Sequence, residues 1–432
     1  MREAHSTDHF EWEPSGTISF PGAYSRTDFS NRGDKGIQDQ IDRNKALGLP
    51  TRSAAEQTDR FLYLNGGLWG QLGKLGATLT ADILRYDVSS TNAAQAPLGV
   101  SITRIHAAVA YSFLQNQLVV GGGLRAAYVD ISESGTAGST LTMFGLSPQA
   151  GLIIKPENRQ FRVGLTARMP VSAGVFDNIT NIVIPNDDGT TVRKAGSFIA
   201  PRRIVQPWEV EAGVAYQLGP RPLNPAWVDP IDHRQVLKDR IAANREARGV
   251  AIAQEIADMP DTTIIDRAAR QERHVRFEAD EARLRATEDL ELANVDEVLF
   301  QERRARYLNW PRERVLLLAS VLMTGASTDA VALEGFIEQR REVVGTRISV
   351  SPRFAVESEA VPNFLKVRGG IYLEPSRFTD GTHRQHFTFG ADFRLFEWSI
   401  FGLFPDHQWR VSAFLDAAER YQNFGIGVGT WH

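Results

Sequence analysis

Residues 345–357, GTRISVSPRFAVE, alternate between apolar and polar side chains along an extended chain. Ile348, Val350, Phe354 and Val356 lie on one side, whereas the intervening arginine, serine and glutamate side chains lie on the other. A period of two indicates a β-strand with two unlike faces. The same alternation recurs in FRVGLTARM (161–169), WEVEAGVAYQL (208–218) and HFTFGADFRLF (386–396).

These strands are long, and each has charged side chains on its polar face. Such a face suits the wet lumen of a membrane barrel, whereas the apolar face suits lipid. We therefore predict an all-β membrane barrel of about 14 antiparallel strands, in a bacterial outer membrane. The expected strands are 17–24, 60–72, 75–89, 99–114, 117–132, 142–155, 159–172, 206–219, 312–324, 345–357, 363–375, 384–397, 408–420 and 423–432.

The connections between these strands alternate in length. Short turns are predicted at 73–74, 115–116 and 156–158, and longer loops near 90–98, 133–141 and 173–205. In bacterial barrels short turns face the periplasm and long loops face outside. Counting along the chain then places residues 220–311 on the periplasmic side.

Composition excludes several classes of protein. No run of about 20 apolar residues exists, so no membrane helix is expected, and with 0 cysteines a disulfide scaffold is excluded. A net charge of −4 gives no reason to expect nucleic-acid binding. MREAHSTDHF at the N-terminus is not a signal peptide. If the chain reaches the outer membrane, we expect an export signal to have been removed.

Two segments depart from the strand pattern and define the expected organisation. Residues 1–59 are polar, contain Gly and Pro, and are predicted to form an N-terminal segment that plugs the barrel. The barrel wall is expected in 60–219 and 312–432. Residues 220–311 are predicted to be a charged helical insertion, broken at Met259-Pro260, with a narrow stripe of small side chains. The insertion either binds a periplasmic partner through 230–308 or is a surface feature without a binding role.

Four stretches resemble the FadL/TodX family of outer-membrane hydrocarbon transporters. They are VAYSFLQNQLVVGGGLRAAYVDIS (109–132), GLSPQAGLIIKPENRQFRVGLTARMPVSAG (145–174), QPWEVEAGVAYQLG (206–219) and KVRGGIYLEPSRF (366–378). The resemblance implies a fourteen-stranded barrel plugged by an N-terminal hatch, which takes up long-chain fatty acids or similar hydrophobic molecules by passive transport. The only Asn-Pro-Ala, which that family's hatch carries near the N-terminus, is at 224–226 in this chain.

Charged side chains on the polar faces are the candidate lumen or substrate contacts, because guanidinium groups bind carboxylates through two hydrogen bonds. The alternative, which we favour for any single arginine, is that these charges pair across neighbouring strands. The candidates are Arg162, Arg168, Glu209, Glu211, Arg347, Arg353, Asp392 and Arg394. An outer entry surface is predicted at Phe176, Ile179, Ile182 and Ile184.

Catalytic and metal-binding patterns are weak. No Gly-x-Ser-x-Gly motif is present, and His383 and His386 are expected in a solvated loop without a third metal ligand. We predict no enzyme activity, cofactor or metal, and ordinary contacts with outer-membrane lipid and lipopolysaccharide. The main hypothesis is passive transport of hydrophobic molecules. The second hypothesis is a docking protein whose periplasmic helical arm holds a partner.

Overall fold

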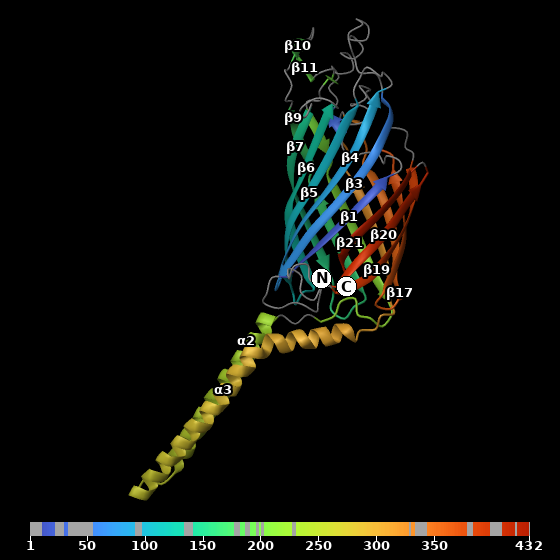
Figure 1. Ribbon diagram of the computed structural model, residues 1–432. Coiled ribbons are helices and arrows are strands. Elements are labelled where there is room, and N and C mark those ends of the chain that lie inside the picture. The colour runs from blue at the N-terminus through green and yellow to red at the C-terminus, as the bar shows by residue number, and fades with distance from the viewer. Residues whose placement is uncertain are drawn as a thin grey trace. The chain divides into compact units, whose positions relative to one another are not determined.

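The computed structural model describes residues 11–21, 30–32, 55–90, 97–133, 141–176, 182–185, 191–195, 198–199, 203–226, 230–327, 330–332, 344–377, 383–397, 408–419 and 421–431. The chain forms two compact units, a β-barrel and a helical unit formed mainly by residues 226–310 (Figure 1). Within the described ranges, no helix combines the length and the apolar character needed to cross a bilayer.

The barrel wall has fourteen strand positions in the described residues, as the sequence predicts. Three positions hold two strands in succession. The wall strands are β1 (Glu11–Pro21), β3 (Ala55–Leu72), β4 (Leu75–Ser90), β5 (Leu98–Phe113), β6 (Leu118–Glu133), β7 (Leu141–Ile154), β8 (Phe161–Arg168) with β9 (Val171–Phe176), β13 (Arg203–Gln206) with β14 (Glu209–Leu218), β15 (Val315–Thr324) with β16 (Ala330–Ala332), β17 (Ser349–Val361), β18 (Leu365–Pro375), β19 (His383–Glu397), β20 (Gln408–Ala418) and β21 (Tyr421–Thr430).

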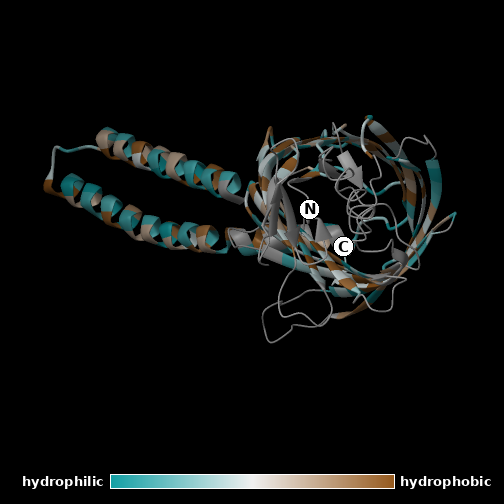
Figure 2. Ribbon diagram, turned by 90° about the horizontal axis from the view of Figure 1, so that it is seen from above, coloured by the Kyte–Doolittle hydropathy of each residue, from teal (hydrophilic) through white to brown (hydrophobic). Residues whose placement is uncertain are grey.

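The sheet closes between its first and last strands. β21 pairs with β1 in antiparallel register, from Gly16 opposite Val428 to Pro21 opposite Asn423, and β1 also pairs with β3. Figure 2 looks down the barrel and shows its wall as a ring. Closure leaves no unpaired edge among the described wall strands, which is the condition for a sheet that spans a bilayer.

Cross-strand registers sort the wall residues into outward and inward rows. One outward row runs through Val163, Val214, Ala319, Phe354, Ile371 and Phe387. These side chains are exposed and apolar, which is the character of a lipid-facing band. The alternation predicted for 161–169, 208–218 and 345–357 is therefore present in the wall.

The short turns are tight and use residues that tolerate positive φ. Gly73 lies at φ 54° between β3 and β4, Asn116 at 64° between β5 and β6, and Asn158 at 55° between β7 and β8. Asn and Gly favour this left-handed region. All three lie where the sequence predicts the turns. In β6, Gly123 permits close strand packing, because a Cβ there would lie 2.1 Å from the Ala107 carbonyl oxygen.

The N-terminal segment contributes to the wall. β1 covers Glu11–Pro21 where a strand is predicted at 17–24, β3 begins at Ala55, and β2 (Ser30–Arg32) pairs with both β13 and β16. Backbone pairing therefore places the described parts of this segment, 11–21, 30–32 and 55–59, among the wall strands. Residues 22–29 and 33–54 lie outside the described residues, so a plug there stays a prediction.

The insertion contains two helices, α2 (Pro230–Asp258) and α3 (Ile264–Leu308), which pack together as a hairpin. Their apolar contact is small and centres on Leu237, Ile241 and Val295. The predicted break at Met259-Pro260 separates them. Thr263 caps α3, since its hydroxyl accepts from the Asp266 N–H at 3.1 Å while the Asp266 carboxylate accepts from the Thr263 N–H at 2.8 Å.

Ion pairs join the two helices where apolar contact is scarce. Arg248 contacts Glu281 at 2.8 Å and Glu288 at 2.9 Å, and Arg273 contacts Glu255 at 2.7 Å. The hydrogen bond from Arg248 is the main cause that lowers the pKa of Glu281. In the same way, Arg245 lowers the pKa of Glu288 and Arg273 lowers the pKa of Glu255.

These shifts make the hairpin sensitive to acid. A carboxylate whose pKa is lowered by folding stabilises the folded state above its unfolded pKa, here about 4.5, and this contribution is lost as the pH falls through the lowered folded value. We expect the thermal midpoint of the helical circular dichroism signal to fall as the pH is lowered through this range. Arg248→Gln should flatten the dependence, and an unchanged slope in that variant would contradict the assignment.

Candidate functional site

Two neighbouring inward rows form the floor of a cavity in the barrel lumen. One row is Gly164, Gly213, Ser320, Arg353, Tyr372 and His386, and the next is Arg162, Ala215, Leu318, Ala355, Gly370, Thr388 and Asp416. Small side chains occupy the middle of both rows. They leave a cavity of about 570 Å³ lined by residues of β7, β8, β14, β15, β17, β18 and β19.

The cavity combines a largely apolar surface with a few polar side chains. Ala215, Leu318 and Ala355 supply apolar surface, and Glu211, Arg353 and Tyr372 supply polar groups. Small-molecule sites in proteins have this composition and a volume of several hundred cubic ångströms. The cavity is therefore a candidate for a ligand site.

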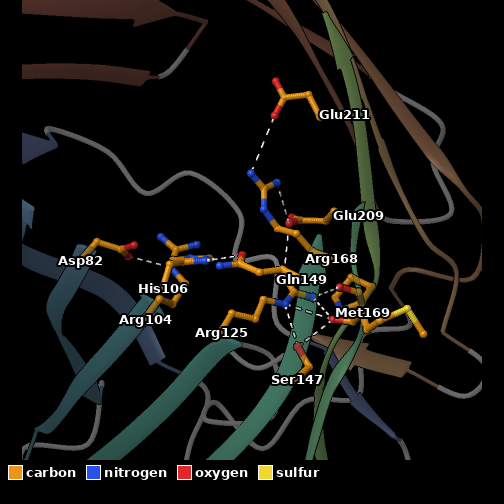
Figure 3. Close-up of polar contacts among 11 residues, drawn as sticks. Asp82, Arg104, His106, Arg125, Ser147, Gln149, Arg168, Met169, Glu209 and Glu211 are labelled. Atoms are coloured by element: carbon orange, nitrogen blue, oxygen red, sulfur yellow. Dashed lines mark hydrogen bonds and ion pairs between the residues drawn. The ribbon is translucent and has the colours of Figure 1, made fainter. Parts of the chain in front are cut away.

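A chain of ion pairs runs beside the cavity from β8 to β17. Arg168 lies 3.3 Å from the Glu209 carboxylate and 3.9 Å from that of Glu211. Glu211 in turn lies 3.6 Å from Arg353 and accepts a 3.2 Å hydrogen bond from the Ser320 hydroxyl. Figure 3 shows Arg168 between the two glutamates. Four of the predicted lumen residues are thus brought together.

Arg125 of β6 is the most buried member of this network, with 1% of its surface exposed. Its guanidinium donates to the Met169 carbonyl at 2.5 Å and the Pro207 carbonyl at 2.8 Å, and contacts the Glu209 carboxylate at 3.2 Å (Figure 3). Met169 and Pro207 lie where β8 gives way to β9 and where β13 gives way to β14.

Proline causes these two strand breaks and also explains the position of Arg125. Pro170 and Pro207 have no N–H to donate to the ladder, so neighbouring carbonyls need another donor. Arg125 supplies it for both strands. Sequence reasoning missed Arg125, although its inward parity with Gly121 and Gly123 on β6 is a signal that was available.

Toward β4, the same polar layer continues through two further contacts. Arg104 of β5 lies 2.7 Å from the Asp82 carboxylate of β4, and His106 lies 3.1 Å from the Gln149 side chain of β7 (Figure 3). Nearer the long-loop end, the inward residues of β5 to β7 are apolar and buried, among them Ile102, Val129 and Met143. The inner wall therefore changes from polar to apolar along the barrel.

The other predicted residues take different places. Arg162 donates to the Asn224 side chain at 2.6 Å and so fixes the chain where it leaves β14. Arg394 donates to the Asn363 carbonyl at 3.3 Å. Asp392 is buried and contacts Arg410 at 2.5 Å and also Arg368. Arg347 precedes β17, which begins at Ser349, and is exposed.

The predicted entry surface lies on separate elements. Phe176 ends β9, whereas Ile182 and Ile184 belong to β10 (Ile182–Pro185). β10 pairs with β11 (Thr191–Ala195), which pairs with β12 (Phe198–Ile199), in a sheet of its own. Ile179 lies outside the described residues. An entry surface here stays a prediction.

The expectation that His386 lies in a solvated loop is wrong. His386 is 0% exposed, because β19 begins at His383 and turns His386 inward. Its ring stacks on Tyr372 at 4.2 Å and its two nitrogens lie near the Glu374 and Asp416 carboxylates. His383, three residues earlier, is exposed.

Comparisons with known proteins find similar structures only. No family model matches the sequence, and no curated protein matches it. Among solved structures, a Pseudomonas aeruginosa FadL homologue shares 7% identity and a TM-score of 0.46, over 97% of this chain and 90% of the other. The Pseudomonas putida toluene transporter TodX shares 8% identity and a TM-score of 0.42, over 99% and 90%.

A third structure is similar to this chain in the same way. A TodX mutant described as a monoaromatic hydrocarbon channel gives 9% identity and a TM-score of 0.46, over 99% of this chain and 91% of the other. These structures are of the family that the sequence motifs resemble. At such identities and TM-scores, the barrel assignment is carried by the chain's own strand pairing.

Arg125 should be the most sensitive position of the polar layer. Arg125→Gln removes a buried cation and leaves Glu209 and two carbonyls short of donors, so we expect a loss of about 3–5 kcal/mol in the free energy of unfolding. Arg353→Gln is the control, because the Arg353 side chain is 43% exposed and its ion pair is 3.6 Å long. Its loss should be at most about 1 kcal/mol.

Urea unfolding of the detergent-solubilised barrel, followed by tryptophan fluorescence, measures both variants. Arg125→Lys should also be destabilised, since a lysine ammonium cannot reproduce the fork that reaches two carbonyls and a carboxylate at once. Equal stability of the Arg125 and Arg353 glutamine variants would contradict a central role for Arg125.

Proposed function

We propose that the chain is a passive channel for hydrophobic small molecules in a bacterial outer membrane. The observation that carries the proposal is the cavity, whose floor of small residues lies inside a barrel with an apolar outer band. A solvent-filled pore for polar solutes would not need an apolar pocket of this kind. Similar solved structures described as a toluene transporter and a monoaromatic hydrocarbon channel agree with this proposal.

Long-chain fatty acids are the finer form of the proposal. Arg353 lines the cavity, its contact with Glu211 is 3.6 Å long, and its side chain is 43% exposed. A guanidinium in this position can bind a carboxylate head group while Leu318, Ala215 and Ala355 contact an apolar tail. Such passage includes no chemical step, so we propose no enzyme activity.

A single engineered cysteine can test cavity binding directly, because the chain has 0 cysteines. Ala355→Cys places a thiol on the cavity floor. In nanodiscs, oleate or toluene should slow its modification by a water-soluble thiosulfonate at least several-fold. Ala286→Cys on the exposed face of α3 is the control and should react at the same rate with or without these compounds.

Protection by toluene alone would retain the channel proposal and remove the fatty-acid form of it. If neither compound protects the thiol at position 355 while the thiol at position 286 behaves as expected, the cavity is not a binding site for hydrophobic molecules and the proposal fails.

A docking role for the helical hairpin is the second candidate. Ile264 and Ile265, at the start of α3 beside the turn from α2, are 84% and 80% exposed. Adjacent large apolar side chains with such exposure are typical of a contact site for another protein. The hairpin forms a compact unit of its own. We propose that this turn contacts a periplasmic protein, as the alternative to a surface feature without a binding role.

Deletion of residues 230–308, with a short Gly-Ser linker in their place, separates the two functions. Uptake of a hydrophobic compound into proteoliposomes should be unchanged, because every lining residue of the cavity lies in the barrel unit. Recovery of a crosslinked periplasmic protein from cells should be lost. Ile264→Ser with Ile265→Ser, in the full chain, should reproduce that loss without shortening the hairpin.

A further inference from the structure

A buried acid–base cluster lies at one end of the cavity floor. The His386 Nδ1 lies 2.9 Å from Asp416 Oδ1, and its Nε2 lies 3.0 Å from Glu374 Oε2. Glu374 also accepts from the Arg384 Nε at 2.9 Å. The two carboxylates come from β18 and β20, on either side of β19, so the imidazole is held from both sides.

These partners decide how many protons the cluster holds. An ionised carboxylate only accepts hydrogen bonds, and a neutral imidazole has a single N–H. Two short contacts to two carboxylates therefore require one further proton, and the imidazolium form places an N–H on each contact. With Arg384, the cluster then holds two cations and two anions, which suits a site shielded from water.

In the described part of the chain, groups from four strands face His386. Tyr372 and Glu374 come from β18, Arg384 from β19 itself, Asp416 from β20 and Tyr421 from β21. The Tyr421 ring centre lies 5.0 Å from that of His386, and the Arg384 guanidinium lies 5.1 Å above the Tyr421 ring.

Tyr372 connects this cluster to the cavity. Its ring lies 4.2 Å from the His386 ring and its hydroxyl donates to Asp416 Oδ2 at 2.7 Å. Tyr372 and Thr388, which is two residues from His386 on β19, both line the cavity. His386 thus holds Tyr372, which lines the cavity, in two ways. Its ring stacks on the Tyr372 ring, and it contacts Asp416, which accepts the hydrogen bond from the Tyr372 hydroxyl.

We propose that His386 is a positioning residue for the cavity: as an imidazolium it fixes Asp416 and Glu374, and through them and its own ring it holds Tyr372 against the ligand. Loss of that proton leaves an excess negative charge between the strands and removes one of the two hydrogen bonds that hold the ring. Tyr372 then loosens, and the cavity binds hydrophobic molecules less tightly. This inference rests on the proposed function of the cavity.

The charge of His386 can be measured without any ligand. In protein labelled with nitrogen-15 histidine in nanodiscs, the resonances absent from His386→Gln should show two protonated nitrogens at neutral pH and above. His383 is the matched control, because it is exposed on the same strand. A neutral His386 ring at neutral pH would overturn the inference.

The link to the cavity is measured with Ala355→Cys. The ratio of its modification rates without and with toluene, taken at each pH, reports binding. This ratio should fall once the pH is raised far enough for His386 to lose its proton, and His383→Gln should leave the profile unchanged. Tyr372→Phe retains the stacked ring and the histidine charge but removes the hydroxyl that reaches Asp416, so it should weaken the pH dependence while the imidazolium resonances persist.

The outcomes separate the two ideas. If His386 is charged, and toluene protects the thiol at position 355 at every pH with no change in the ratio of rates, the positioning role is overturned and the channel proposal remains. An absence of protection at every pH, with a charged His386, overturns the channel proposal and with it the role of His386. Should His386→Gln fail to fold, Tyr372→Phe and the wild-type resonances, assigned by elimination of the other histidines, still decide the matter.

Discussion

The structure depends on the closure of one antiparallel sheet. In a bilayer, each backbone N–H and C=O must be paired within the protein, and pairing of β1 with both β21 and β3 meets this condition without an edge strand. Closure also decides the direction in which alternating side chains point. Once the ring exists, each strand has one face toward lipid and one toward the lumen, so Val214 and Phe354 lie outside while Glu211 and Arg353 lie inside.

The inward charges then have to be balanced within the lumen. Arg168 pairs with Glu209 and Glu211 across neighbouring strands, Glu211 also reaches Arg353 two strands away, and Asp392 is held by Arg368 and Arg410. This favours the alternative raised from sequence, in which most charges hold the wall together. Arg125 also satisfies backbone acceptors, since it donates to the Met169 carbonyl, next to Pro170, and to the Pro207 carbonyl. Where the inward residues are small and uncharged, no charge has to be balanced. The space that they leave in the lumen is the cavity.

Ion pairs also hold the helical hairpin together, but for a different reason. It has little apolar surface to bury between α2 and α3, so Arg248, Arg273 and their glutamate partners supply contacts that a larger core would otherwise provide. The Arg273–Glu255 pair is exposed to solvent, and exposed pairs contribute modestly one by one. A long hairpin of this kind is held by many weak contacts, in contrast to the cooperative barrel wall.

The sequence alone determined the strands, the short turns and the inward or outward parity of each residue. These follow from local rules: a period of two along an extended chain, and Gly or Asn where φ is positive. The tertiary structure alone decided which inward residues meet. Arg125 and Glu209 are 84 positions apart, and their contact depends on how far each intervening strand is shifted along its neighbour. It also decided that His386 is buried between two carboxylates, because this depends on registers between strands that local patterns do not contain.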